Sequence, residues 1–74
     1  MEHNRRHAIT IDRNDQDTVD DILMQFYERG DIDSVTVGDL LICGERLIRL
    51  RIECDEDDLT AIQNELTNRG VEFR

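Results

Sequence analysis

The chain has 74 residues, with 18 acidic and 9 basic side chains and a net charge of −9. A chain of this length forms one domain and buries only about 60% of its unfolded surface, which leaves little room for a deep substrate cavity. The acidic balance argues against direct binding to nucleic acid, because neutralising phosphate groups requires clustered Lys and Arg.

Composition also bears on where the protein resides. No apolar run reaches the roughly 18 residues of a membrane span, and no secretory pattern occurs, so we expect a cytoplasmic protein without membrane contact. Two cysteines, Cys43 and Cys54, are too few for the disulfide framework of a small secreted domain, and we expect both to be reduced. Every basic residue is Arg, which also fits a salt-adapted host whose acidic surface serves solubility alone.

The first half of the chain reads as a strand followed by a helix. Residues 1–6 are polar and predict a flexible tail, and residues 7–12 alternate as a strand does. Residues 13–30 then follow a helical period, ending at Gly30 in the left-handed position. The apolar face consists of Val19, Ile22, Leu23 and Phe26, and the N-cap candidates are Asn14, Asp15 and Asp17.

The second half repeats this order. Residues 34–44 predict a second strand, interrupted or bulged at Gly38–Asp39, and Gly44–Glu45 predicts the turn into a third strand over residues 45–54. Residues 55–70 predict a second helix that ends at Gly70, and residues 71–73 predict a short last strand. Positions forty residues apart match, as in Ile22 and Ile62.

These elements predict a single α+β domain over residues 7–74. The order β-α-β-β-α-β is that of a ferredoxin-like fold, with a four-stranded antiparallel sheet and both helices on one face. In the third strand, Ile48, Leu50 and Ile52 then face the helices. The alternate set faces away from them, on the open side of the sheet: Leu47, Arg49, Arg51 and Glu53.

The sequence favours a protein that is not an enzyme. The two histidines, His3 and His7, lie in or beside the predicted tail, away from any nucleophile they would activate, and no glycine-rich phosphate loop occurs. The acidic run from Asp12 lacks the Gly and the Glu of a calcium-binding loop, so its carboxylates are expected to cap a helix. We therefore expect no metal site and no cofactor.

One segment resembles a known family. In Ile9–Val37, a strand that ends in Asp12-Arg13 leads into a turn and a helix, which is similar to the opening of ACT-type regulatory domains. Asn14-Asp15 stands where that family has a Pro-Gly turn. The resemblance implies, as one alternative, a dimeric regulatory domain that senses a small molecule at this turn.

The leading hypothesis is a non-enzymatic module that docks a carboxylate-rich face on a basic protein surface. Size and charge are similar to those of inhibitors such as phage anti-CRISPR proteins, which occupy nucleic-acid channels as mimics of nucleic acid. Complementary charge would speed such association, and salt would weaken it. The expected acidic face comprises Asp15, Asp17, Asp20, Asp21, Glu28, Asp55, Glu56, Asp57, Asp58 and Glu65.

A second hypothesis concerns self-association. Three consecutive apolar residues in the second strand cannot all face the core, and an exposed apolar edge strand invites pairing with another chain. We expect a homodimer formed through this strand and the open sheet face, in which Arg stems cover apolar area. The residues assigned to this surface are Leu40, Leu41, Leu47, Arg49 and Arg51.

Overall fold

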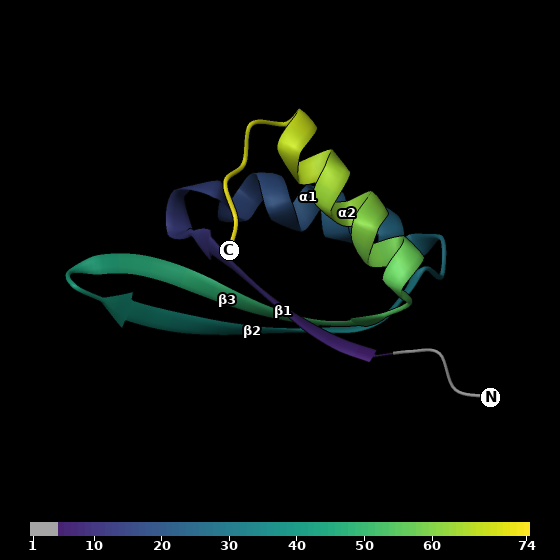
Figure 1. Ribbon diagram of the computed structural model, residues 1–74, viewed down its shortest axis with the longest axis horizontal. Helices are drawn as coiled ribbons and strands as arrows, with labels where there is room; N and C mark the ends of the chain where they lie inside the picture. Colours follow the sequence, from purple (N-terminus) through teal and green to yellow (C-terminus); the bar gives the residue numbers. More distant parts are fainter. Residues whose placement is uncertain (1–4) are drawn as a thin grey trace.

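A three-stranded antiparallel sheet, covered on one face by two helices, makes up the described part of the computed structural model, residues 5–74 (Figure 1). The strand order is β1-β3-β2, so β3 is central. In chain order the elements are β1 (Arg5–Asp12), the 3₁₀ turn η1 (Arg13–Asp15), α1 (Gln16–Glu28), β2 (Ile32–Ile42), β3 (Glu45–Cys54) and α2 (Glu56–Asn68).

The predicted four-stranded ferredoxin-like sheet is wrong, because residues 5–74 run β-α-β-β-α and form no fourth strand. The last residues make only one bridge, Ile11 to Phe73, beside a pair of hydrogen bonds between the backbones of Thr10 and Arg74. Four residues follow Gly70, and the first of them, Val71, donates its N–H to the Leu66 carbonyl of α2 at 2.9 Å. The residues after Gly70 therefore contribute a single bridge and no ladder.

Strand β1 begins earlier than the sequence indicated. Arg5 and Arg6 already pair with Cys54 and Glu53 of β3, whereas both were assigned to the polar tail. The central strand extends far enough to hold these residues in the ladder. Residues 1–4 of the predicted tail lie outside the described residues.

The β2–β3 hairpin also differs from its prediction. Its turn is Cys43–Gly44, one residue earlier than expected, with φ angles of 51° and 80° that fit a two-residue hairpin turn. The predicted bulge at Gly38–Asp39 is wrong, because both residues stay in register with β3. The register shifts instead near the start of β2, between Ile32 and Ser34.

The core lies between the sheet and the helices. Ile48, Leu50 and Ile52 of β3 are buried there against Ile22 of α1 and Ile62 of α2, which confirms the side predicted for these residues. Burying each such side chain contributes about 1.5–3 kcal/mol to folding. The two helical stripes therefore fix which face of the sheet is covered.

Both helices end in the same way. Gly30 and Gly70 have φ angles of 80° and 75°, as predicted for residues that follow a helix C-terminus. The next residues, Asp31 and Val71, donate to carbonyls five residues back at 3.0 and 2.9 Å, which completes a Schellman motif in each helix.

The start of α1 departs from the predicted N-cap. Asp15 occupies the cap position, but its side chain makes no capping hydrogen bond. The carboxylate of Asp12 instead accepts from the backbone N–H of Asn14 at 2.8 Å, and so caps η1. The capping function therefore falls one turn earlier in the chain.

The β2–β3 hairpin extends well past the helices and past the end of β1 (Figure 1). It gives the molecule extents of 42 by 23 by 17 Å. Near the tip, Leu41 and Ile42 of β2 are exposed, because no helix lies over this part of the sheet.

Candidate functional site

Large exposed apolar side chains are concentrated on two neighbouring elements. Within residues 5–74 there are five of them, and all belong to α1 or β2: Met24, Tyr27, Val37, Leu41 and Ile42. Met24 and Tyr27 are 60% and 58% exposed. Met24, Tyr27 and Val37 lie together on one side, whereas Leu41 and Ile42 lie near the hairpin tip. An apolar patch such as the first three residues form is typical of an interaction surface.

A groove of about 520 Å³ runs between α1 and β2. Asp20, Met24 and Tyr27 follow the helical spacing i, i+4, i+7 and form a stripe beside the buried stripe of α1. Val35 and Val37 pair with Ile52 and Leu50 of β3, so they point to the helix side of the sheet. The lining residues are Asp20, Leu23, Met24, Tyr27, Asp33, Ser34, Val35 and Val37.

The two charged residues that line this groove are both acidic. Neither α1 nor β2 contains an Arg, a Lys or a His, and Asp20 and Asp33 lie at the groove itself. The acids of the two elements are Asp17, Asp20, Asp21, Glu28, Asp33 and Asp39. An apolar floor with an acidic rim is complementary to a partner that combines apolar and basic side chains.

Strand β2 is also an edge of the sheet. It is eleven residues long, and β3 occupies only one of its sides. Protective devices of natural edge strands include lysine, proline and bulges. Here the strand has one register irregularity near its start and one acid, Asp39, in its second half. The edge is therefore open to pairing along most of its length.

The ten acids of the predicted acidic face lie on or beside the two helices, which cover the same face of the sheet (Figure 1). Because β1 and β3 are antiparallel, the helices that follow them begin at opposite ends of the sheet. Asp15, Asp17, Asp20, Asp21 and Glu28 therefore accompany α1, whereas Asp55, Glu56, Asp57, Asp58 and Glu65 accompany α2. Among these ten residues, Asp20 lines the groove. Glu56 and Glu65 form exposed ion pairs with Arg5 at 3.6 Å and Arg69 at 3.4 Å.

Carboxylates crowd together where α2 begins. Partial burial raises the pKa of Asp58, and the charges of Asp31, Asp55 and Asp57 raise it further, while Arg29 acts in the opposite direction. Burial also raises the pKa of the neighbouring Cys54 thiol to about 11. Since the thiolate is the reactive form, Cys54 is an unreactive core residue at neutral pH.

The open face of the sheet carries the predicted arginines. Arg49 lies between Thr10 and Gly38 of the adjacent strands, and Arg51 lies between Ala8 and Thr36. Both guanidinium groups are exposed, and neither is in an ion pair within 4.0 Å among the described residues. The fourth residue of that row, Glu53, accepts a hydrogen bond from Ser34 at 3.2 Å.

Leu47 behaves differently from the other residues assigned to self-association. It lies on the open face opposite Leu40, but it is only 5% exposed. The end of the chain runs close by, with Arg74 bonded to the backbone of Thr10 and its side chain 3.9 Å from Glu45. Leu47 is thus covered within one chain and offers little area to a partner.

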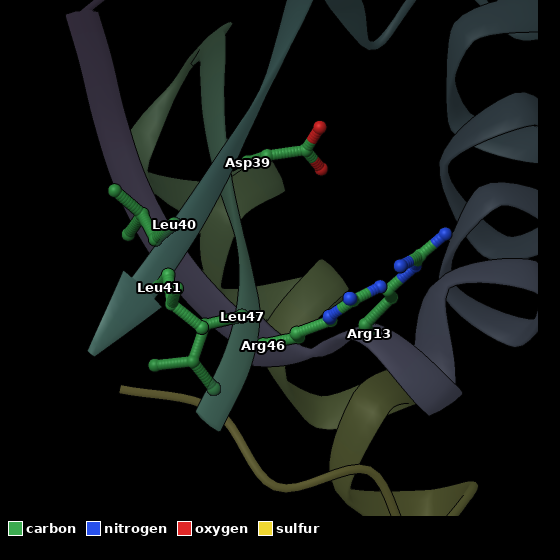
Figure 2. A pocket seen from close by; sticks show the side chains of 6 residues that line it. All are labelled: Arg13, Asp39, Leu40, Leu41, Arg46 and Leu47. Carbon is green, nitrogen blue, oxygen red and sulfur yellow. The ribbon is translucent and has the colours of Figure 1, made fainter. Parts of the chain in front are cut away.

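Leu40 and Leu41 point to opposite sides of the hairpin. Figure 2 shows Leu40 on one side of β2, whereas Asp39 projects to the other side, as do Arg13 and Arg46. The hollow here measures about 340 Å³ and is lined by Arg13, Asp39, Leu40, Leu41, Arg46 and Leu47. Leu41 is 72% exposed and Leu40 is half-buried, so the two leucines do not form one continuous patch.

The turn after Asp12-Arg13, which suggested a small-molecule site, is partly engaged in hydrogen bonding within the fold. One carboxylate oxygen of Asp12 is engaged by the Asn14 N–H, as described above. The adjacent hollow is polar and open, and it is lined by Asp12, Arg13, Asn14, Asp17, Glu45 and Arg46. Because three carboxylates and two guanidinium groups surround this hollow, it favours neither an anionic nor a cationic ligand.

Arg49, Arg51 and seven of the ten predicted acids lie at exposed positions, whereas Asp15, Asp58 and Glu65 are half-buried. Sequence reasoning missed the groove. Its apolar members, Met24, Tyr27, Val35 and Val37, were not singled out. The available signal was the position of Met24 and Tyr27 outside the i, i+3, i+4, i+7 stripe of α1, which leaves two large side chains facing solvent. Their proximity to β2 depends on tertiary packing.

Other kinds of site find no support in the described part of the chain. No group of three or more His, Cys, Asp or Glu residues is arranged to hold a metal ion among residues 5–74. No helix in that range is long and apolar enough to cross a membrane. Comparisons with protein-family models, curated proteins and solved structures find no match to this chain.

Proposed function

We propose that this chain is a non-enzymatic protein-binding module, an inhibitor or adaptor that docks on a basic protein surface. The observation that carries this proposal is the groove between α1 and β2. It combines Met24, Tyr27 and Val37 as exposed apolar contacts with Asp20 and Asp33 at its rim. Apolar contacts of this kind supply affinity, and the surrounding charge selects the sign of the partner.

The acids next to the groove support the same reading. Asp17, Asp21 and Glu28 are exposed on α1, and α1 and β2 contribute no positive charge. A basic partner would approach a negative field without meeting a like charge on these two elements. The arginines of the open sheet face lie on the opposite side of the sheet from α1, so they do not reverse this field locally.

The test compares two sets of charge removals. Asp20→Asn, Asp21→Asn and Glu28→Gln remove three charges from α1. Glu45→Gln, Asp57→Asn and Glu72→Gln remove three exposed charges elsewhere. Host proteins retained by the immobilised chain at low salt are identified and purified, and each is titrated with the wild type and both variants. We expect the α1 variant to bind about tenfold more weakly and the control to change little.

Circular dichroism is expected to show the same fold for both variants, because exposed charges contribute little to stability, roughly within 0.5 kcal/mol each. Equal weakening by the two variants would show that the partner responds to net charge alone. That result would remove the groove as the binding site. Binding that the α1 variant leaves unchanged at low salt would instead show that these acids only keep the surface solvated.

A further inference from the structure

We infer that the partner binds by strand addition: an extended basic segment pairs with the free edge of β2 and places alternate apolar side chains in the groove. This inference rests on the proposed function and adds the mode of binding and the chemistry of the bound segment. It combines two features of the same side of the molecule, an unpaired edge and an apolar flank.

The edge is regular enough to accept a strand. From Ser34 to Ile42 the pairing of β2 with β3 proceeds without a shift, so this stretch is a continuous strand. In antiparallel pairing, the backbone N–H and C=O groups of alternate residues point to one side of a strand and the remainder to the other. No backbone partner lies on the outer side of this stretch among the described residues. Nine residues provide an edge of about 30 Å.

The groove would receive the side chains of an added strand. A strand next to β2 would lie about 4.8 Å away, and every second side chain would point to the helix side of the sheet. On that side, Val35 and Val37 of β2 and Met24 and Tyr27 of α1 form the apolar lining. Apolar residues at alternate positions of the bound segment would therefore cover these four side chains.

Charge decides between a basic segment and a second copy of this chain. Twofold pairing of β2 with the same strand of another copy would bring Asp20, Asp33 and Asp39 of both copies to one seam. Neither β2 nor α1 contains an Arg or Lys, although Arg13 and Arg46 lie on the same side of β2 as Asp39 (Figure 2). Around Asp20, like charges of two copies would disfavour the pairing, whereas Lys or Arg at groove-facing positions of the bound segment would attract this carboxylate.

The second half of the chain lacks this combination. At the positions of α2 forty residues after Met24 and Tyr27 stand Asn64 and Thr67, which are polar. The free side of β1 is partly occupied by the end of the chain, where Phe73 bridges Ile11 and Arg74 bonds Thr10. Within residues 5–74, an open edge and an exposed apolar flank therefore occur together only beside α1.

The experiment uses three synthetic nonapeptides with blocked ends. The first has lysine, valine, valine and lysine at its four groove-facing positions, with threonine at the positions between them. The second has the same sequence with proline at its centre, and the third has glutamate in place of lysine. Binding is titrated by NMR on the 74-residue chain, together with amide hydrogen exchange. We expect the first peptide to bind about tenfold more tightly than the second and to protect alternate amides over residues 35–41. The glutamate peptide is expected not to bind.

Matched protein variants use residues taken from the chain itself. Met24→Asn with Tyr27→Thr gives α1 the side chains of α2, and Asn64→Met with Thr67→Tyr makes the reverse change on α2. The first variant is expected to lose at least about tenfold in affinity for the lysine–valine peptide, and the second to retain it. If circular dichroism shows the same helical content in both variants as in the wild type, a change of fold is excluded as the cause.

The outcomes separate the mode of binding from the function. One outcome would overturn strand addition and leave the basic-partner function standing. In it, the proline peptide binds as tightly as the first peptide, Asp20→Asn weakens the binding of both peptides, and Asp57→Asn weakens the binding of neither. If no α1 variant changes the binding of any peptide, both the strand-addition inference and the proposed function are overturned. If the outer amides of β2 are protected without peptide and the mass in solution is doubled, a second copy occupies the edge and this inference is overturned.

Discussion

The two helices show how one pattern yields two different surfaces. α1 and α2 are both thirteen residues long, begin forty residues apart and end in the same Schellman geometry. Two buried positions correspond, with Ile22 matching Ile62 and Phe26 matching Leu66, whereas the buried Leu23 corresponds to the half-buried Gln63. Of the exposed positions, Met24 and Tyr27 of α1 correspond to polar residues in α2. The repeat is thus retained at the centre of the core and lost toward the side of α1 that meets solvent.

This difference indicates where interaction is encoded. The exposed area of a large apolar side chain does not stabilise the fold, and of the two helices only α1 has such side chains, Met24 and Tyr27. The edge strand beside α1 offers an explanation for them, because the two elements together form the groove. The α2 side, which is flanked by the end of the chain, has no counterpart to that groove in the described residues.

The largest expected effect concerns the equivalent core positions of the two helices. Ile22→Ala and Ile62→Ala each remove a side chain that is fully buried at equivalent positions. Each is expected to destabilise the domain by about 2–5 kcal/mol, through lost transfer energy and a cavity. Urea denaturation followed by circular dichroism measures both. A loss several kcal/mol larger for one variant would mean that the two helices are not equivalent in the core.

A smaller, paired effect is expected at the helix C-termini. Gly30 and Gly70 adopt left-handed φ angles, with open space where a Cβ would be placed. Alanine at either position therefore costs roughly 1–2 kcal/mol from backbone strain alone, without steric overlap. The same denaturation measurement is expected to give similar losses for Gly30→Ala and Gly70→Ala. A loss at only one site would show that only that helix end requires the left-handed conformation.

The sequence predicted these shared features because they follow from local pattern. Helical periodicity placed Ile22 and Ile62 in the core, and the glycines marked both helix ends. Period-two alternation likewise separated Leu50 from Arg49 and Arg51. Local pattern did not predict the hairpin register, since Gly38 suggested a bulge that the uninterrupted pairing with Arg49 excludes. It also missed the groove, because the approach of α1 to β2 is a tertiary contact.

The prediction of a short last strand over residues 71–73 was wrong for a different reason. Val71 and Phe73 have the alternation of a strand, but Val71 completes the C-terminus of α2. The same backbone N–H cannot serve both the helix end and a sheet ladder, and the helix end prevails.

The arginines extend the comparison to the sheet face that neither helix covers. Arg49→Ala combined with Arg51→Ala is expected to lower stability only modestly, by at most about 1 kcal/mol for two exposed side chains. The sequence-based hypothesis predicts that this variant weakens self-association or partner binding. Light scattering across concentration and titration with a purified partner measure these effects. A large loss of stability with association unchanged would show that the pair is structural.

The smallest effect concerns the first turns of the helices, where α2 has Asp58 and α1 has Thr18 at the equivalent position. Burial and neighbouring carboxylates raise the pKa of folded Asp58 above its ordinary value of 3.8. Folding therefore favours the protonated form of Asp58, which adds to the stability of the domain at low pH. This stabilisation is lost as the pH rises through the folded pKa of Asp58. At neutral pH the charged side chain costs stability, so Asp58→Asn is expected to raise the melting temperature.

The rise is expected to be at most about 4 °C, as for a surface substitution of up to roughly 0.5 kcal/mol in a small domain. It is expected to disappear below the ordinary carboxyl pKa of 3.8, where the wild-type side chain is also neutral. Thermal denaturation at a series of pH values measures this difference, and Asp17→Asn in the first turn of α1 serves as the control. An increase that persists unchanged at low pH would show that Asn stabilises the turn for reasons other than charge. A decrease at neutral pH would mean that attraction between the Asp58 carboxylate and the N-terminus of α2 outweighs repulsion from its neighbours.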